Sequence, residues 1–192
     1  MAIDAHTHTL CPGVNPLVAG RPELAAIPYQ RDLSAESRAV DHDQFPDLLK
    51  AFLQAERRLA DMAEMRITHQ VVAPAPGQQH YWAEPALLDQ LSRLQNEHVA
   101  AMCAANPRAF SGLGTLPMTA PDLAIATATH GVESLGLKGF QIDTRAGAME
   151  LSDPALDPLW ARLERLDTAV MLHPLGFSDG RRLSPFFMVN TC

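Results

Sequence analysis

Ala2-Ile3-Asp4-Ala5-His6-Thr7-His8, near the start of the chain, is an apolar segment that leads into two histidines separated by one residue. In a β-strand, successive side chains point to opposite faces, so His6 and His8 share a face and can bind the same divalent metal ion. Leu10-Cys11-Pro12-Gly13 then breaks the pattern. The pair is therefore expected at the carboxyl end of a strand, where barrel active sites lie. The alternative is a strand with two surface histidines.

Composition restricts the class of protein. A chain of 192 residues that is 47% hydrophobic can bury one core, and we expect a single domain. The formal net charge of -7 provides no basic surface for nucleic acid or an anionic membrane, and no apolar run is long enough to span a bilayer. Three scattered cysteines indicate neither a disulfide framework nor a zinc knuckle. We expect a cytoplasmic protein with a small-molecule partner.

Helical and extended patterns alternate along the chain. Residues 14–45 are rich in Pro, Asp, Ser and Arg and have no sustained period, so we expect a long insertion loop. Apolar residues recur at helical spacing from Pro46 to Met65. Further helices are expected over 85–105, 121–135 and 154–166, and strands over 67–73, 110–116, 137–142 and 169–173. Including the first strand, this predicts a parallel sheet with right-handed crossovers.

Two parallel folds fit this alternation, an open doubly wound sheet and a (β/α)8 barrel. Gly112-Leu113-Gly114 lacks the remaining glycine of a dinucleotide fingerprint, and no glycine-rich phosphate loop follows the first strand. A nucleotide-binding fold is therefore disfavoured. The last strand ends at His173, because Pro174 holds the residue before it in an extended conformation. Three histidines are thus expected on one rim of the sheet.

Several segments together resemble the amidohydrolase-related proteins of the aminocarboxymuconate-semialdehyde decarboxylase type. They are, in order, Asp4–His8, Tyr81–Ala83, Gly112–Met118, Gly139–Ile142 and Leu172–Pro174. The resemblance implies a (β/α)8 barrel with one divalent metal ion, zinc or in some members manganese. It also implies that His6, His8 and His173 are metal ligands.

The family pattern includes groups that this sequence does not contain. Relatives have an aspartate ligand after the eighth strand and a proton-transferring histidine after the sixth, whereas this chain includes only about the first five βα units. Its catalytic residues are therefore unknown. Arg145 occupies a position where relatives often have asparagine, which leaves the substrate open.

Candidate substrate-binding residues lie outside the histidine set. The guanidinium of Arg145 matches a carboxylate, and Trp82 follows the second strand beside His80. The ordinary interpretations are a solvated arginine and a packed aromatic residue. Asp4 shares a face with His6 and is expected either to orient a ligand imidazole or to make structural contacts.

The other histidines have ordinary interpretations. His69 lies in the second strand and is expected to be a hydrogen-bonded histidine near the core. His42, His98 and His130 fall in loop or helical segments and are expected at the surface. None of these four is expected to join the metal site.

The sequence is compatible with three functions. The first is a metal-dependent decarboxylase, a carbon-carbon lyase, that acts on a small carboxylated aromatic compound or ring-cleavage product. The second keeps the metal site but hydrolyses an amide or lactone. The third is a catalytically inactive fragment, because five strands leave both sheet edges unpaired and expose apolar side chains such as Val170 and Leu172. Such edges could also pair in a homo-oligomer.

Overall fold

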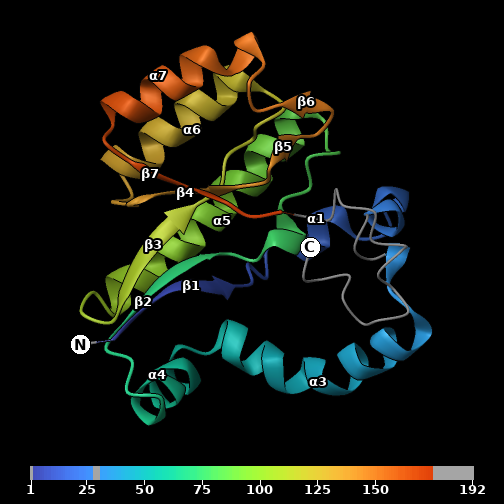
Figure 1. Cartoon of the computed structure of the whole chain (residues 1–192), viewed down its shortest axis with the longest axis vertical. Helices are drawn as coiled ribbons and strands as arrows, with labels where there is room; N and C mark the ends of the chain where they lie inside the picture. Colours follow the sequence, from blue (N-terminus) through green and yellow to red (C-terminus); the bar gives the residue numbers. More distant parts are fainter. Residues whose placement is uncertain (1, 28–30, 175–192) are drawn as a thin grey trace.

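The structure, a computed structural model, describes residues 2–27 and 31–174. Its centre is a parallel sheet whose strands lie side by side in the order in which they occur along the chain (Figure 1). The described strands of this sheet, in spatial order, are β1 (Ile3–Thr9), β2 (His69–Pro74), β3 (Phe110–Gly114), β4 (Gly139–Ile142) and β7 (Ala169–Leu172). Helical crossovers connect them, as parallel strands require.

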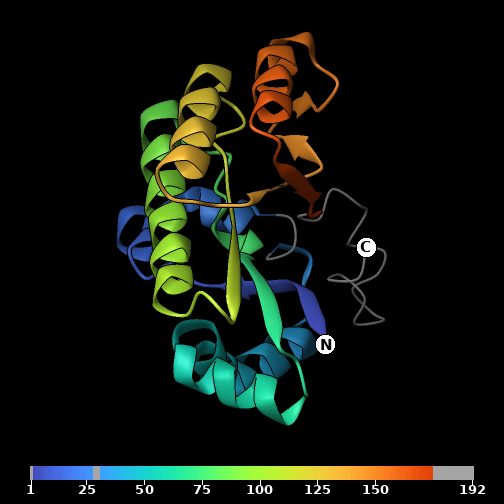
Figure 2. The same cartoon turned by 90° about the vertical axis from the view of Figure 1, so that its left-hand side faces the viewer.

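Helices cover one side of this sheet. The longer ones are α3 (Ala35–Leu53), α4 (Ala55–Glu64), α5 (Pro85–Ala105), α6 (Pro121–Glu133) and α7 (Asp157–Arg165). Figure 2 shows α5 and α6 side by side on one side of the strands. The shorter elements are α1 (Val14–Val18), the 3₁₀ turns η1 (Pro22–Ala26), η2 (Pro76–Gln78) and η3 (Pro154–Leu156), and the hairpin of β5 (Arg145–Ala146) and β6 (Met149–Glu150).

The main core lies between the sheet and helices α5, α6 and α7. Leu116, Phe140 and Leu159 are completely buried in it. Gly114 allows α5 to approach β3 closely, because a Cβ atom there would lie 2.6 Å from the side-chain oxygen of Asn96. The Gly-x-Gly pair of this strand therefore serves helix packing, which agrees with the absence of a nucleotide fingerprint.

The two edge strands are more exposed than the three central ones. Ile3 on β1 is 59% exposed, and Val170 and Leu172 on β7 are 37% and 53% exposed. The exposure of Val170 and Leu172 agrees with the expectation for a sheet that ends at its fifth strand. Neither edge has a second neighbouring strand among the described residues.

Residues 14–45 differ from the expected irregular loop. They contain α1, η1 and the first part of α3, which begins at Ala35 rather than near Pro46. The side chain of Ser34 caps α3 by accepting a hydrogen bond from the backbone N–H of Ser37. Because α3 buries none of its residues, its sequence has no apolar stripe that would reveal a helix.

From β2 onward the observed elements lie within three residues of the expected bounds, and α5 coincides with its expected range. The largest difference is at α7, which begins at Asp157 because residues 154–156 form the 3₁₀ turn η3. The hairpin of β5 and β6 was not expected, because each strand has only two residues. No described helix has the length and apolar character needed to cross a membrane.

Candidate metal centre

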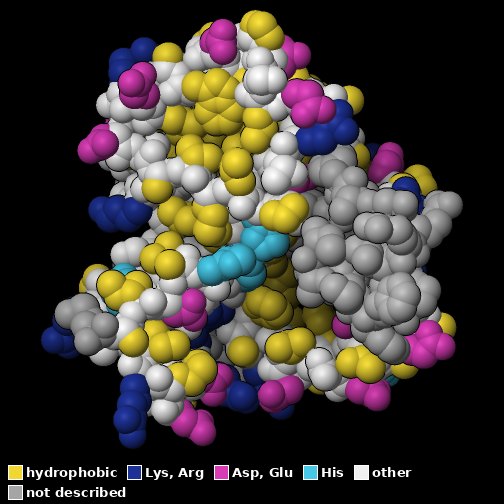
Figure 3. Space-filling view, in the orientation of Figure 1, with side chains coloured by type: hydrophobic (Ala, Val, Ile, Leu, Met, Phe, Trp, Pro, Cys, Tyr) yellow, Lys and Arg dark blue, Asp and Glu magenta, His cyan; other side chains and the backbone are white. Residues whose placement is uncertain are grey.

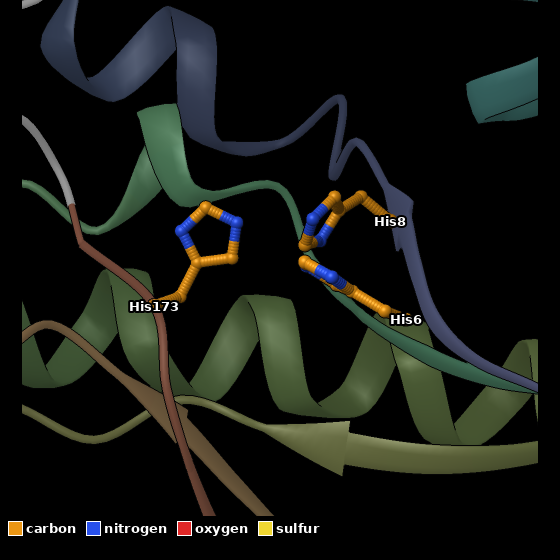
Figure 4. A group of neighbouring side chains, drawn as sticks. All are labelled: His6, His8 and His173. Carbon is orange, nitrogen blue, oxygen red and sulfur yellow. The ribbon is translucent and has the colours of Figure 1, made fainter. Parts of the chain in front are cut away.

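Three imidazoles from the two edge strands meet at the carboxyl end of the sheet. The ring centroids of His6 and His8 are 4.9 Å apart, and that of His173 lies 5.0 Å and 5.1 Å from them. Figure 4 shows His173 on one side of the group and the other two rings opposite it. One nitrogen from each ring lies within 4.8 Å of the others. Two ligands at about 2.1 Å from one ion are at most about 4.2 Å apart, so a small ring rotation suffices.

This meeting depends on the curl of the sheet. Strands lie about 4.8 Å apart, so the first and fifth strands of a flat sheet would be about 19 Å from each other. Imidazoles at 5 Å therefore require the sheet to bend until its edges face one another. Such curvature is that of a barrel wall.

The electrostatics of the site favour the neutral form of His8 and His173. The pKa of His8 is lowered to about 4, first by burial and then by the positive charges that His173 and His6 carry when protonated. Burial likewise lowers the pKa of His173. Moreover, Nδ1 of His8 is buried and has no hydrogen-bond partner among the described residues. Unpartnered, neutral ring nitrogens are the donors that a divalent cation needs, so these residues fit a metal ion.

His173 is fixed by β4 and by the proline that follows it. Its backbone N–H donates to the carbonyl of Ile142 at 2.9 Å. Its ring Nδ1 lies 3.1 Å from the carbonyl oxygen of Pro174. Because a carbonyl oxygen only accepts, Nδ1 carries the proton in that hydrogen bond and Nε2 keeps the lone pair. This tautomer leaves Nε2 as the ligand atom.

Strand β1 is irregular at the first of its two histidines, His6. Its register with β2 shifts between Asp4 and Thr7, as in a β-bulge, and bulges redirect side chains. The backbone N–H of His6 donates to Oδ1 of Asp4 at 3.3 Å, and the other carboxylate oxygen accepts from Nε2 of Gln70 at 3.2 Å. Asp4, a candidate to orient an imidazole, thus contacts the main chain of His6 and a neighbouring amide.

Trp82 lines a cavity of about 450 Å³ together with His80 and Asp143. His80 is only 7% exposed, and burial lowers its pKa to about 4. The two rings of the His80–Trp82 pair have centroids 5.4 Å apart. Asp143 directly follows Ile142, whose carbonyl binds His173, so the cavity borders the segment that holds this histidine. Figure 3 shows histidine side chains at the centre of one face, next to hydrophobic ones.

Arg145 is engaged within the hairpin of β5 and β6. Its Nη2 lies 3.0 Å from a carboxylate oxygen of Glu150 and donates to the carbonyl of Ala148 at 3.1 Å. Arg145 does not line the cavity beside Trp82. To bind a substrate carboxylate it would have to share or release these partners.

His69 and His42 lie outside the cluster. The ring of His69 is hydrogen-bonded at both nitrogens, 3.2 Å from the carbonyl of Arg108 and 2.9 Å from the hydroxyl of Ser111. This confirms its interpretation as a hydrogen-bonded structural histidine. The side chain of His42 is 90% exposed, as expected for a surface residue.

The expectation for His98 and His130 was wrong. Both are half-buried, and Nε2 of His98 lies 3.3 Å from the hydroxyl of Thr9. Burial also lowers the pKa of His98. For His98, the reason is that α5 packs against the sheet and turns the His98 side chain toward the end of β1. Helical spacing alone does not reveal this contact.

Comparison with known proteins agrees with the fold and the site. The chain matches the family described as Amidohydrolase over residues 3–188, and it belongs to that family. The resemblance expected from its motifs is thereby confirmed. The chain is also similar to the 2-amino-3-carboxymuconate-6-semialdehyde decarboxylase of Dictyostelium discoideum, with 28% identity over 189 residues, 98% of this chain and 53% of that protein.

Other relatives are decarboxylases as well. The gamma-resorcylate decarboxylase of Rhodococcus jostii is 32% identical over 93 residues, 44% of this chain and 28% of that protein. The chain spans about half the length of the curated decarboxylases that it matches along most of its sequence.

Solved structures share the fold. The 5-carboxyvanillate decarboxylase of Novosphingobium aromaticivorans, complexed with manganese and a nitrobenzoic acid, has a TM-score of 0.82 and 21% identity, covering 100% of this chain and 54% of that one. A dihydroxybenzoic acid decarboxylase of Polaromonas sp. JS666 with bound manganese has a TM-score of 0.73 and 21% identity, covering 96% and 53%. The described sheet therefore corresponds to five strands, with the helices that connect them, of the (β/α)8 barrel of this family.

Proposed function

We propose that this chain carries part of the active site of a metal-dependent decarboxylase for a small carboxylated aromatic compound or ring-cleavage product. The observation that carries the proposal is the meeting of His6, His8 and His173 from opposite edges of the sheet. Decarboxylases among its relatives, including a muconate-semialdehyde and a resorcylate enzyme, support the type of reaction. A divalent ion in this place would supply Lewis-acid polarisation of a substrate oxygen.

The chain's own residues would hold the ion and the substrate. His8 and His173 are neutral at pH 7 because of their lowered pKa values, so their lone pairs are available. The cavity beside Trp82 would take the substrate's ring, since about 450 Å³ lies within the size range of small-molecule pockets. Arg145 is the candidate for binding the substrate carboxylate, with Glu150 as its competitor.

Zinc is the first choice for the ion and manganese the alternative. Three imidazole nitrogens suit zinc, whereas manganese prefers oxygen ligands. Manganese is favoured by the two decarboxylase structures that contain it. We further propose a cytoplasmic location, which the free thiols of Cys11 and Cys103 support, and a homo-oligomer formed through the sheet edges.

Turnover by the full 192-residue chain, loaded with zinc or manganese, tests the proposal. One panel contains hydroxylated benzoates and an aminocarboxymuconate semialdehyde, and the other contains amides and lactones. Release of carbon dioxide, lost in the His173→Ala variant and kept in His42→Ala, supports the decarboxylase. Hydrolysis of the second panel instead supports a hydrolase, the reaction suggested by the family's name. Metal binding without turnover on either panel supports an inactive fragment that retains the histidine site.

A further inference from the structure

A line of hydrogen bonds runs behind the metal-binding end of β1 and touches the main chain of both histidines. It begins where Asp4 accepts from the backbone N–H of His6 at 3.3 Å and from Nε2 of Gln70 at 3.2 Å. Oε1 of Gln70 then accepts from Nη1 of Arg58 at 3.2 Å. The line ends where Nη2 of Arg58 donates to the carbonyl of His8.

The middle of this line is buried. Arg58 is 8% exposed and Gln70 is 5% exposed. Nη2 of Arg58 also donates to the carbonyl of Ala51 at 3.0 Å, which connects helix α4 to the end of α3. Removing a guanidinium from water is costly, and apolar replacements of buried ionic groups are often neutral or stabilising. Stabilisation of the fold is therefore a weak explanation for the burial of Arg58. Precise positioning of the backbone groups that it contacts is a better one.

The β1 main chain needs such support at His6. Asp4 and Thr7 each have a register partner on β2, but Ala5 and His6 between them have none. The ladder between the strands therefore does not fix the backbone from which the His6 ring projects. The carboxylate of Asp4 takes over this task, and Gln70 and Arg58 in turn fix the carboxylate.

We propose that Arg58 and Gln70 are positioning residues that set the direction of the His6 and His8 imidazoles for a divalent cation. The inference rests on the proposed metal site, because it concerns the same two ligands. Neither residue touches the ion or the substrate. Each acts through the main chain of β1, so its loss should change the affinity and the geometry of the site together.

Cobalt(II) titration of the full chain tests this inference, since the visible spectrum of bound cobalt reports coordination geometry independently of turnover. Arg58→Ala and Gln70→Met should each weaken cobalt binding by about 10–100-fold, the range found for residues that orient metal ligands. At saturating cobalt both variants should also show an altered spectrum. Arg58→Lys should not restore the wild-type spectrum, because one ammonium cannot reproduce the planar fork of donors.

Arg57→Ala is the matched control. Arg57 is the neighbour of Arg58 on α4, but its guanidinium faces solvent and pairs with Asp61 at 2.8 Å and Asp47 at 3.2 Å. Its loss should leave cobalt affinity and spectrum unchanged. Thermal unfolding of the metal-free proteins identifies a variant that fails to fold, in which case Gln70→Met and Arg58→Lys decide the outcome.

The possible failures are distinguishable. If the wild-type chain binds no cobalt, the proposed metal site is wrong and the inference falls with it. If the wild type binds cobalt while folded variants bind it with equal affinity and an identical spectrum, Arg58 and Gln70 are structural residues only. A variant that is less stable but keeps the wild-type spectrum and affinity also shows a purely structural role.

Discussion

The centre of the sheet and its edges have different roles. Ile142 on β4 is completely buried, whereas Leu172, its register partner on β7, is 53% exposed. All three clustered histidines belong to the edge strands or follow them directly. The buried centre therefore stabilises the fold, whereas the edges carry the candidate metal ligands. The two are connected because the packed centre sets the curvature that brings the edges together.

The largest expected effect is on the edges. His173→Ala removes the histidine that follows β7, so we expect the affinity for zinc to fall by more than the ~10–100-fold typical of residues around a metal site. Competition with a chelator measures this. His42→Ala, an exposed substitution on α3, should have no effect. Equal affinity in the two variants would contradict the ligand assignment.

A pair of substitutions compares the centre with an edge directly. Ile142→Ala should lower the free energy of unfolding by about 2–5 kcal/mol, because it leaves a cavity in the core. Leu172→Ala, at the partner position, should change it by less than about 1 kcal/mol. Urea denaturation of both variants gives the two values. Equal losses would show that β7 is as well packed as β4.

Acid should reveal a third, smaller effect at the cavity. The pKa of His80 is about 4 in the folded chain and about 6.5 when unfolded, so between these values the unfolded state binds a proton that the folded state does not. The free energy of unfolding therefore keeps its full value with respect to His80 above pH 6.5. It falls by up to about 3 kcal/mol as the pH drops toward 4. The His80→Gln variant should lose less stability than the wild type over this range in denaturation at several pH values. Parallel curves for the two proteins would refute this assignment.

The smallest effect concerns association through the edges. Leu172→Lys places a charge on the exposed part of β7 and should reduce self-association while changing stability by about 0.5 kcal/mol or less. Sedimentation velocity over a range of concentrations measures the change. Arg66→Lys, at an exposed position just after α4, keeps the charge and serves as the control. If wild type and Leu172→Lys associate equally, the edge is not the contact.

Sequence patterns predicted the sheet and the histidines because these features follow local rules. His6 and His8 share a face through strand alternation, and the proline after His173 ends its strand. The burial of Arg58 had no such signal, because it lies beside Arg57 in the sequence and only packing shows which of the two is buried. Similarly, the first part of helix α3 escaped prediction because the helix buries no residue.

The proposed metal site joins histidines from both edges of the sheet around one ion. X-ray absorption spectroscopy of the zinc-loaded chain tests it most directly, since the scattering of imidazole rings allows histidine ligands to be counted. The structure predicts three imidazoles at about 2.0–2.1 Å in the wild type and two in His173→Ala. A zinc ion with fewer than three imidazoles in the wild type, or with the same number in both proteins, would contradict a site shared by the two edges.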